Sequence, residues 1–151
     1  MAASKKKPKI KDVPSARSVG RREDPDGYFS LYPSWRFSSC DREEWRIEDA
    51  PEVFFDKVLP YLKGIETLRW KEVMQSEKQN HLIDPADLQK KAQRRLLALR
   101  VEAESIMSLR VQATYRLYGL IDPYGVFNVL WLDLYHGDND RCVCRSHLKH
   151  T

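Results

Sequence analysis

The stretch Tyr115–Leu134, YRLYGLIDPYGVFNVLWLDL, decides the fold of this chain. Apolar residues dominate on both sides of Asp122–Gly125, a short segment with proline near its start and glycine at its end. This pattern predicts a β-hairpin with strands over 115–121 and 126–134. If residues 121 and 126 pair, Arg116 lies opposite Trp131, with Asp133 diagonal to it.

The chain before the hairpin predicts further strands and three helices. Ser34–Ser39 alternates large apolar with polar residues, as a strand does. A helix is expected over about 50–63, where Pro60 removes a backbone donor and favours a kink. Thr67 is expected to cap a short second helix, and Asp84-Pro85 to start a long amphipathic helix over about 85–106. A short strand around Leu109 and Val111 leads into the hairpin.

The order of these elements, β-α-α-α-β-β-β, predicts an α+β fold with a small antiparallel sheet and helices packed on one face. The hairpin strands are apolar on both faces, so the other face should also be covered, by the segment before residue 34. We expect a single α+β domain over 28–151. Residues 1–27 contain almost no large apolar side chain and are expected to form a disordered basic tail.

Charge is distributed unevenly along the 151 residues. Residues 1–22 hold eight Lys or Arg against one Asp, whereas the remainder is slightly acidic, although the formal net charge of the chain is +4. Any basic surface on the folded part must therefore be local. The tail is either an electrostatic arm for RNA, a ribosome or DNA, or an extension that only raises solubility.

Several functional classes find no support in the sequence. No apolar run approaches the ~20 residues that span a bilayer, and no secretory signal is evident, so we expect a cytoplasmic protein with no membrane partner. P-loop, dinucleotide-loop, nucleophile-elbow and HExxH motifs do not occur. The spacing of Cys142, Cys144, His147 and His150 lies outside the usual structural zinc patterns, so no metal or other cofactor is expected.

The polar face of the predicted long helix is basic, with Lys90, Lys91, Arg94, Arg95 and Arg100. Arg94 and Arg95 are candidates for contacts with a nucleic-acid backbone. A solvated basic face is the commoner explanation for such a pattern.

Three segments carry a family resemblance: Ser108–Arg110, Tyr115–Gly119 and Val126–His136. They resemble the C-terminal half of RelE/ParE-type toxin domains, in which an arginine-bearing strand leads into a hairpin whose last strand ends beside a histidine. The chain also resembles a set of short uncharacterised prokaryotic proteins that are regarded as remote members of that group. In motif, the resemblance covers about residues 105–136.

This resemblance implies metal-free cleavage of messenger RNA, often on the ribosome, in which the 2′-hydroxyl attacks the adjacent phosphate. It implies that Arg110 holds the phosphate and that His136 acts as acid or base. Arg116 would be a second cation, and His81, expected in the loop before the long helix, would complete an acid–base pair. Lys149 and His150 would contact RNA from the C-terminal end. RNA or a ribosome and an antitoxin protein are the implied partners.

Each assignment has a structural alternative. Arg110 could pair with a helix carboxylate, His136 could cap a loop, and His81 could be exposed. A non-catalytic module of the same fold, binding protein or nucleic acid through Trp131, Tyr135 and the basic helix, is the alternative function. A nuclease requires Arg110 and His136 to converge on one exposed concave surface, whereas a binding module does not.

Overall fold

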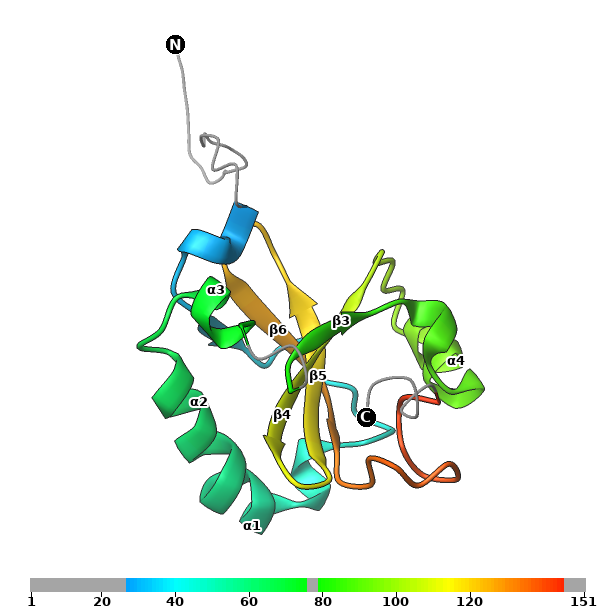
Figure 1. Ribbon diagram of the computed structural model, residues 1–151. Helices are drawn as coiled ribbons and strands as arrows, with labels where there is room; N and C mark the ends of the chain where they lie inside the picture. Colours follow the sequence, from blue (N-terminus) through cyan, green and yellow to red (C-terminus); the bar gives the residue numbers. More distant parts are fainter. Residues whose placement is uncertain (1–26, 76–78, 146–151) are drawn as a thin grey trace.

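A computed structural model describes residues 27–75 and 79–145. The expected tail lies outside these residues, apart from Gly27. The centre of the fold is a five-stranded sheet with the order β2-β6-β5-β4-β3 (Figure 1). Its strands are β2 (Ser34–Arg36), β3 (His81–Ile83), β4 (Ile106–Gln112), β5 (Tyr115–Ile121) and β6 (Val126–Asp133).

The predicted α+β class is confirmed, but the sheet is mixed and not purely antiparallel. Strands β4, β5 and β6 form an antiparallel meander, whereas β2 runs parallel to β6, with Ser34 opposite Val126. Strand β3 was not predicted. It pairs with the edge of β4, with His81 opposite Ser108, so the expectation that His81 lies in a loop is wrong.

The hairpin is present, but its register differs from the predicted one. Ile121 pairs with Phe127, and a register shift at Tyr118/Gly119 places Arg116 directly opposite Asp133 instead of Trp131. The backbones approach closely at the shift, since a Cβ on Gly119 would lie 2.3 Å from the carbonyl oxygen of Asn128. Glycine is therefore required there by the contact itself.

The first helix extends beyond its predicted end. It comprises α1 (Pro51–Val53), a π-helical turn over Phe54–Val58 and α2 (Leu59–Ile65). The Leu59 amide bonds the carbonyl of Phe54, five residues back. Pro60 has no amide to donate, so an irregular turn just before it accommodates the missing bond.

The short second helix is α3 (Trp70–Val73), and its cap is not Thr67. The Arg69 amide donates to Glu72 Oε1 at 2.8 Å, whereas the Thr67 hydroxyl donates to the Gly64 carbonyl. Thr67 therefore stabilises the end of the preceding helix.

The predicted long helix over 85–106 is wrong in length. A 3-10 turn over Pro85–Asp87 precedes α4 (Lys90–Ala98), and Ile106 already belongs to β4. Arg100 ends the helix with φ 59°, and the amides of Arg100 and Val101 bond the carbonyls of Leu97 and Leu96. This is a Schellman motif with arginine where glycine usually stands, so the sequence carried no stop signal.

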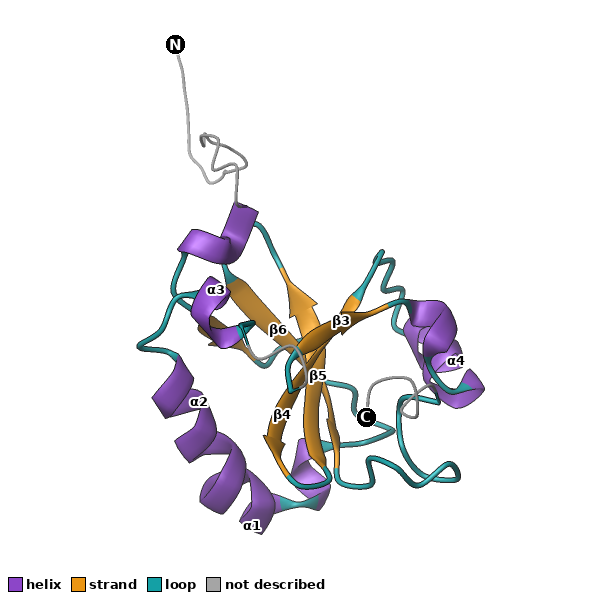
Figure 2. Cartoon of the chain, viewed as in Figure 1, coloured by secondary structure: helices purple, strands orange, loops and turns teal. Residues whose placement is uncertain are grey.

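Helices cover both faces of the sheet, so the prediction of helices on one face is also wrong (Figure 2). On one face, α2 and α3 pack against β4–β6 through a core that includes Leu62, Trp70, Leu109 and Phe127. On the other, α4 and the segment after β6 form a second core around Leu88, Leu96, Tyr118, Trp131 and Val143. The second cover is thus α4 and not the segment before residue 34.

Candidate functional site

Two rows of cross-strand partners lie on the α4 side of the sheet. The first row is His81, Ser108, Tyr118 and Trp131, one residue from each of β3, β4, β5 and β6. The second row, two residues along β4 and β5, is Arg110, Arg116 and Asp133. Paired residues project from the same face, and Tyr118 and Trp131 belong to the core under α4. The sheet therefore brings His81, Arg110 and Arg116 onto one face.

Arg110 and Arg116 are direct partners in the β4–β5 ladder. Arg116 is buried, and its Nη1 donates to the carbonyls of Ala113 (2.6 Å) and Tyr115 (3.2 Å). Burial lowers the pKa of Arg116, and the charge of Arg110 lowers it further. Arg110 is only half-buried, so it is the more accessible of the two cations.

Asn80 fixes the backbone beside this pair. Its Oδ1 accepts from the Arg110 amide (2.8 Å) and the Tyr61 hydroxyl (3.3 Å), and its Nδ2 donates to the Val73 carbonyl (2.8 Å). Asn80 is buried and precedes His81 in the chain. It thus ties α2 and α3 to β4 at Arg110. Asn80 was not predicted, because no local pattern in the sequence marks an asparagine that bonds distant elements.

Asp133 organises the segment that follows β6. Its fully buried carboxylate accepts from the amides of Tyr135 (2.8 Å) and Val143 (2.9 Å). Burial raises the pKa of Asp133 to about 6, although the two amides and the Arg116 charge act in the opposite direction. Burial and the charge of Asp133 also raise the pKa of Tyr118, whose phenol stays protonated at neutral pH.

His136 lies beside the β4–β5 turn, where its amide donates to the Thr114 carbonyl at 3.2 Å. The Ala113 carbonyl in the same turn accepts a hydrogen bond from Arg116. The backbone of His136 therefore lies beside the turn that holds the Arg116 side chain. His81 lies on the edge strand β3. Three inter-strand spacings, roughly 14 Å, separate β3 from β6. The two histidines therefore lie at different places around the sheet, His81 on its β3 edge and His136 beside the β4–β5 turn.

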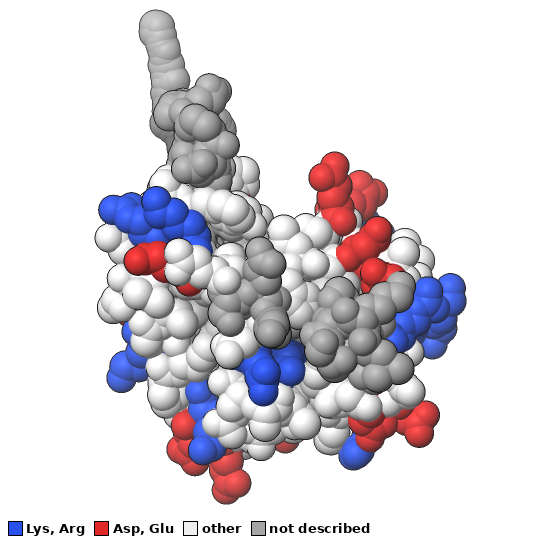
Figure 3. Space-filling model, viewed as in Figure 1, with Lys and Arg blue, Asp and Glu red and all other residues white. Residues whose placement is uncertain are grey.

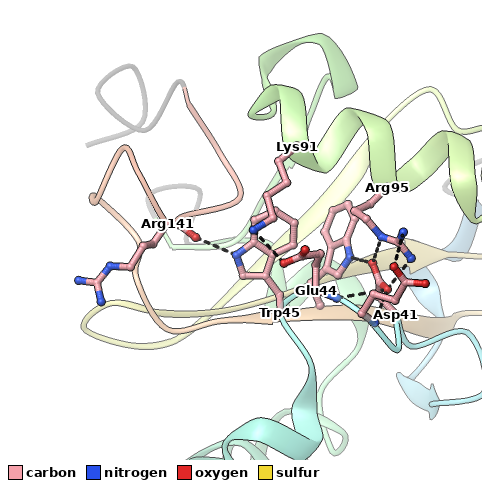
Figure 4. A network of polar contacts seen from close by, with 8 residues as sticks. Asp41, Glu44, Trp45, Lys91, Arg95 and Arg141 are labelled. Carbon is pink, nitrogen blue, oxygen red and sulfur yellow. Dashed lines mark hydrogen bonds and ion pairs between the residues drawn. The ribbon is translucent and has the colours of Figure 1, made fainter.

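Arg95 forms a fork with a buried carboxylate (Figure 4). Its Nε donates to Asp41 Oδ2 (2.9 Å) and its Nη2 to Asp41 Oδ1 (2.8 Å). Trp131 Nε1 donates to the same Oδ2 at 2.9 Å, and Asp41 is completely buried. Burial raises the pKa of Asp41, but the bonds from Arg95 and Trp131 outweigh it and leave the pKa lowered. Arg95 therefore joins α4 to the segment after β2.

Other cations of α4 differ in their surroundings. Lys91 pairs with Glu44 at 2.8 Å and stands 5.4 Å from the ring centroid of Trp45 (Figure 4). Arg94, which lies between Lys91 and Arg95 in the sequence, is exposed. Contact of Arg94 with nucleic acid stays a prediction, and Lys149 and His150 lie outside the described residues.

The described residues contain no group of three or more His, Cys, Asp or Glu side chains placed to hold a metal ion. Cys142 and Cys144 are buried, and Cys142 Sγ donates to the Cys144 carbonyl at 3.1 Å. His147 and His150, the other two residues of that spacing, lie outside the described part of the chain.

Comparison with known proteins adds no family to this description, because no family model, curated protein or solved structure matches the chain. Among the described helices, none is both long and apolar enough to cross a membrane.

Proposed function

We propose that the protein binds RNA through Arg110 and Arg116 and cleaves it without a metal. The observation that carries the proposal is the cross-strand pairing of these arginines on one face. Like charges directly opposite one another cost a sheet stability, and a bound phosphate offsets that cost. A half-buried arginine beside a buried one is a better site for a bound anion than for water alone, because both charges are partly removed from solvent.

Each side chain has a role in the proposed reaction. Arg110 holds the scissile phosphate by its guanidinium fork, and Arg116 adds a second positive charge from the neighbouring strand. One histidine takes the proton of the attacking 2′-hydroxyl, and the other protonates the leaving 5′-oxygen. His81 lies on the strand next to β4 and His136 beside the β4–β5 turn, and in this proposal the RNA would extend across Arg110 from one to the other. The products are a 2′,3′-cyclic phosphate and a free 5′-hydroxyl.

A non-catalytic module that binds nucleic acid or protein is the second candidate. Arg116 favours it, because its Nη1 already donates to two turn carbonyls, Ala113 and Tyr115. Under this alternative Arg110 contributes charge for binding and the histidines are not needed. An antitoxin-type protein would be a partner under either proposal.

The two candidates separate in a bacterial host. Induction of the intact chain should arrest growth and bulk translation, and Arg110→Gln and His136→Ala, at equal soluble levels, should each relieve the arrest. Relief by Arg110→Gln alone favours binding without cleavage. Arrest that neither substitution changes would place the activity elsewhere in the chain.

A further inference from the structure

A pocket of about 300 Å³ lies outside the arginine pair, where β3, β4 and β5 meet the loop between α4 and β4. Its accessible lining is mixed and more polar than apolar, but it includes one well-exposed apolar side chain, Leu82, which is 47% exposed. Two exposed carboxylates from the loop complete the lining. The lining includes Tyr28, Leu82, Leu120, Ile121, Glu102 and Glu104.

The two carboxylates carry uncompensated charge. Within residues 27–75 and 79–145, Glu102 and Glu104 form neither an ion pair nor a side-chain hydrogen bond. Figure 3 shows acidic side chains gathered over the segment that leads from α4 to β4. An exposed leucine in a recess beside unpaired carboxylates favours an apolar group flanked by cations.

We propose that this pocket binds Lys9-Ile10-Lys11 of the same chain. Among residues 1–26, Ile10 is the one large aliphatic residue with a basic neighbour on each side. In an extended conformation Ile10 projects to one side of the backbone and both lysines to the other. Ile10 enters the recess, and the lysines at its edge pair with Glu102 and Glu104, which are also two residues apart.

The connection to the folded part supports an intramolecular partner. Tyr28, the second described residue, lines the pocket. Residues 12–27 span at most about 55 Å when fully extended, which allows Lys11 to reach the pocket. Tethering at this length gives an effective concentration on the order of millimolar, so weak contacts suffice. Docking at this pocket is independent of RNA cleavage, and it would withdraw these lysines from nucleic acid.

The test is methyl NMR on the full chain with labelled Ile δ1 and Leu methyl groups. We expect nuclear Overhauser effects (NOEs) between Ile10 and the Leu82 and Leu120 methyls at low salt. They should be lost in Glu102→Gln/Glu104→Gln, which removes only exposed, unpaired charges. Glu52→Gln/Asp56→Asn, the same charge change on the exposed surface of the first helix, should retain them. No NOE from Ile10 to either leucine would overturn the proposal.

Limited trypsin digestion gives an independent readout. In the intact chain, cleavage after Lys9 and Lys11 should be about five-fold slower than in the Glu102→Gln/Glu104→Gln variant, as expected if exposed ion pairs protect the segment. Cleavage after Arg17 in the same molecules is the internal control and should not change. Equal rates at Lys9 and Lys11 in the intact chain and in that variant would contradict docking.

Discussion

Arg110 lies directly opposite Arg116 across the β4–β5 ladder, and Arg116 in turn lies opposite Asp133 in β6. The row across β4, β5 and β6 therefore holds two positively charged side chains followed by one carboxylate. The carboxylate is committed to two backbone amides, and Arg116 to two backbone carbonyls. Arg110 has the least fixed side chain of the three, which makes it the residue on which the proposed function depends.

Removal of the Arg110 charge should raise stability while it weakens RNA binding. Arg110→Gln removes a like-charge cross-strand pair, so the free energy of unfolding should rise by about 0.5 kcal/mol in urea titrations without ligand. RNA affinity, measured by fluorescence anisotropy, should fall. Arg94→Gln, on the exposed surface of α4, is the control and should leave stability unchanged. Loss of stability in Arg110→Gln would indicate a structural ion pair instead.

Arg95 should prove structural. Arg95→Ala leaves the Asp41 carboxylate buried without its cation and should lower the free energy of unfolding by about 3 kcal/mol. Arg95→Lys should lose less stability, because lysine keeps the positive charge beside Asp41 but lacks the guanidinium fork. Thermal and urea unfolding would measure both. An Arg95→Ala protein of full stability but weakened RNA affinity would support the nucleic-acid contact predicted from the sequence.

Asp133 should give stability an identifiable pH dependence. Its pKa is raised to about 6 in the folded chain, against about 3.9 when unfolded, so the folded state binds the proton more tightly. Stability from this group is therefore greatest below pH 4 and is lost as pH rises through 6, by about 1.4 kcal/mol per unit. Unfolding at pH 4.5 and 7 should show this loss in the intact chain and not in Asp133→Asn. Equal pH dependence in both proteins would refute the assignment.

Gly119→Ala should be strongly destabilising. The added Cβ would stand 2.3 Å from the Asn128 carbonyl oxygen and 2.8 Å from the Phe127 ring, inside the central β5–β6 ladder. We expect a loss of about 3 kcal/mol, because backbone must move. Gly64→Ala, where the Cβ meets nothing within 4 Å, is the matched control and should be neutral or stabilising in the same thermal unfolding measurement.

The sequence predicted the parts of the fold that local patterns determine. The hairpin turn at Asp122–Gly125 and the helix after Ala50 follow from turn chemistry and periodicity, and both are present. Strand β3 was missed because three residues are too short for a period to emerge. The end of α4 was missed because Arg100 adopts a left-handed conformation that glycine usually signals.

The site was predictable by residue type but not by geometry. Arginine on a strand marked Arg110 and Arg116, yet their direct pairing depends on the position of the β4–β5 turn, and the pairing of Arg116 with Asp133 depends on the register shift at Gly119. Asn80 and Asp41 gave no signal, because the partners that give them their structural roles lie at least seven residues away from Asn80 and more than 50 residues away from Asp41. Long-range hydrogen bonds of this kind follow from the tertiary fold and not from spacing.

Cleavage of an end-labelled RNA in the presence of EDTA, with and without programmed ribosomes, tests the central claim most directly. The intact chain and Lys63→Gln, a charge change on the exposed surface of α2, should produce fragments that end in a 2′,3′-cyclic phosphate. Arg110→Gln should cleave about 100-fold more slowly. Cleavage by Arg110→Gln at the rate of the intact chain, or no cleavage by the intact chain under either condition, would contradict the proposed function.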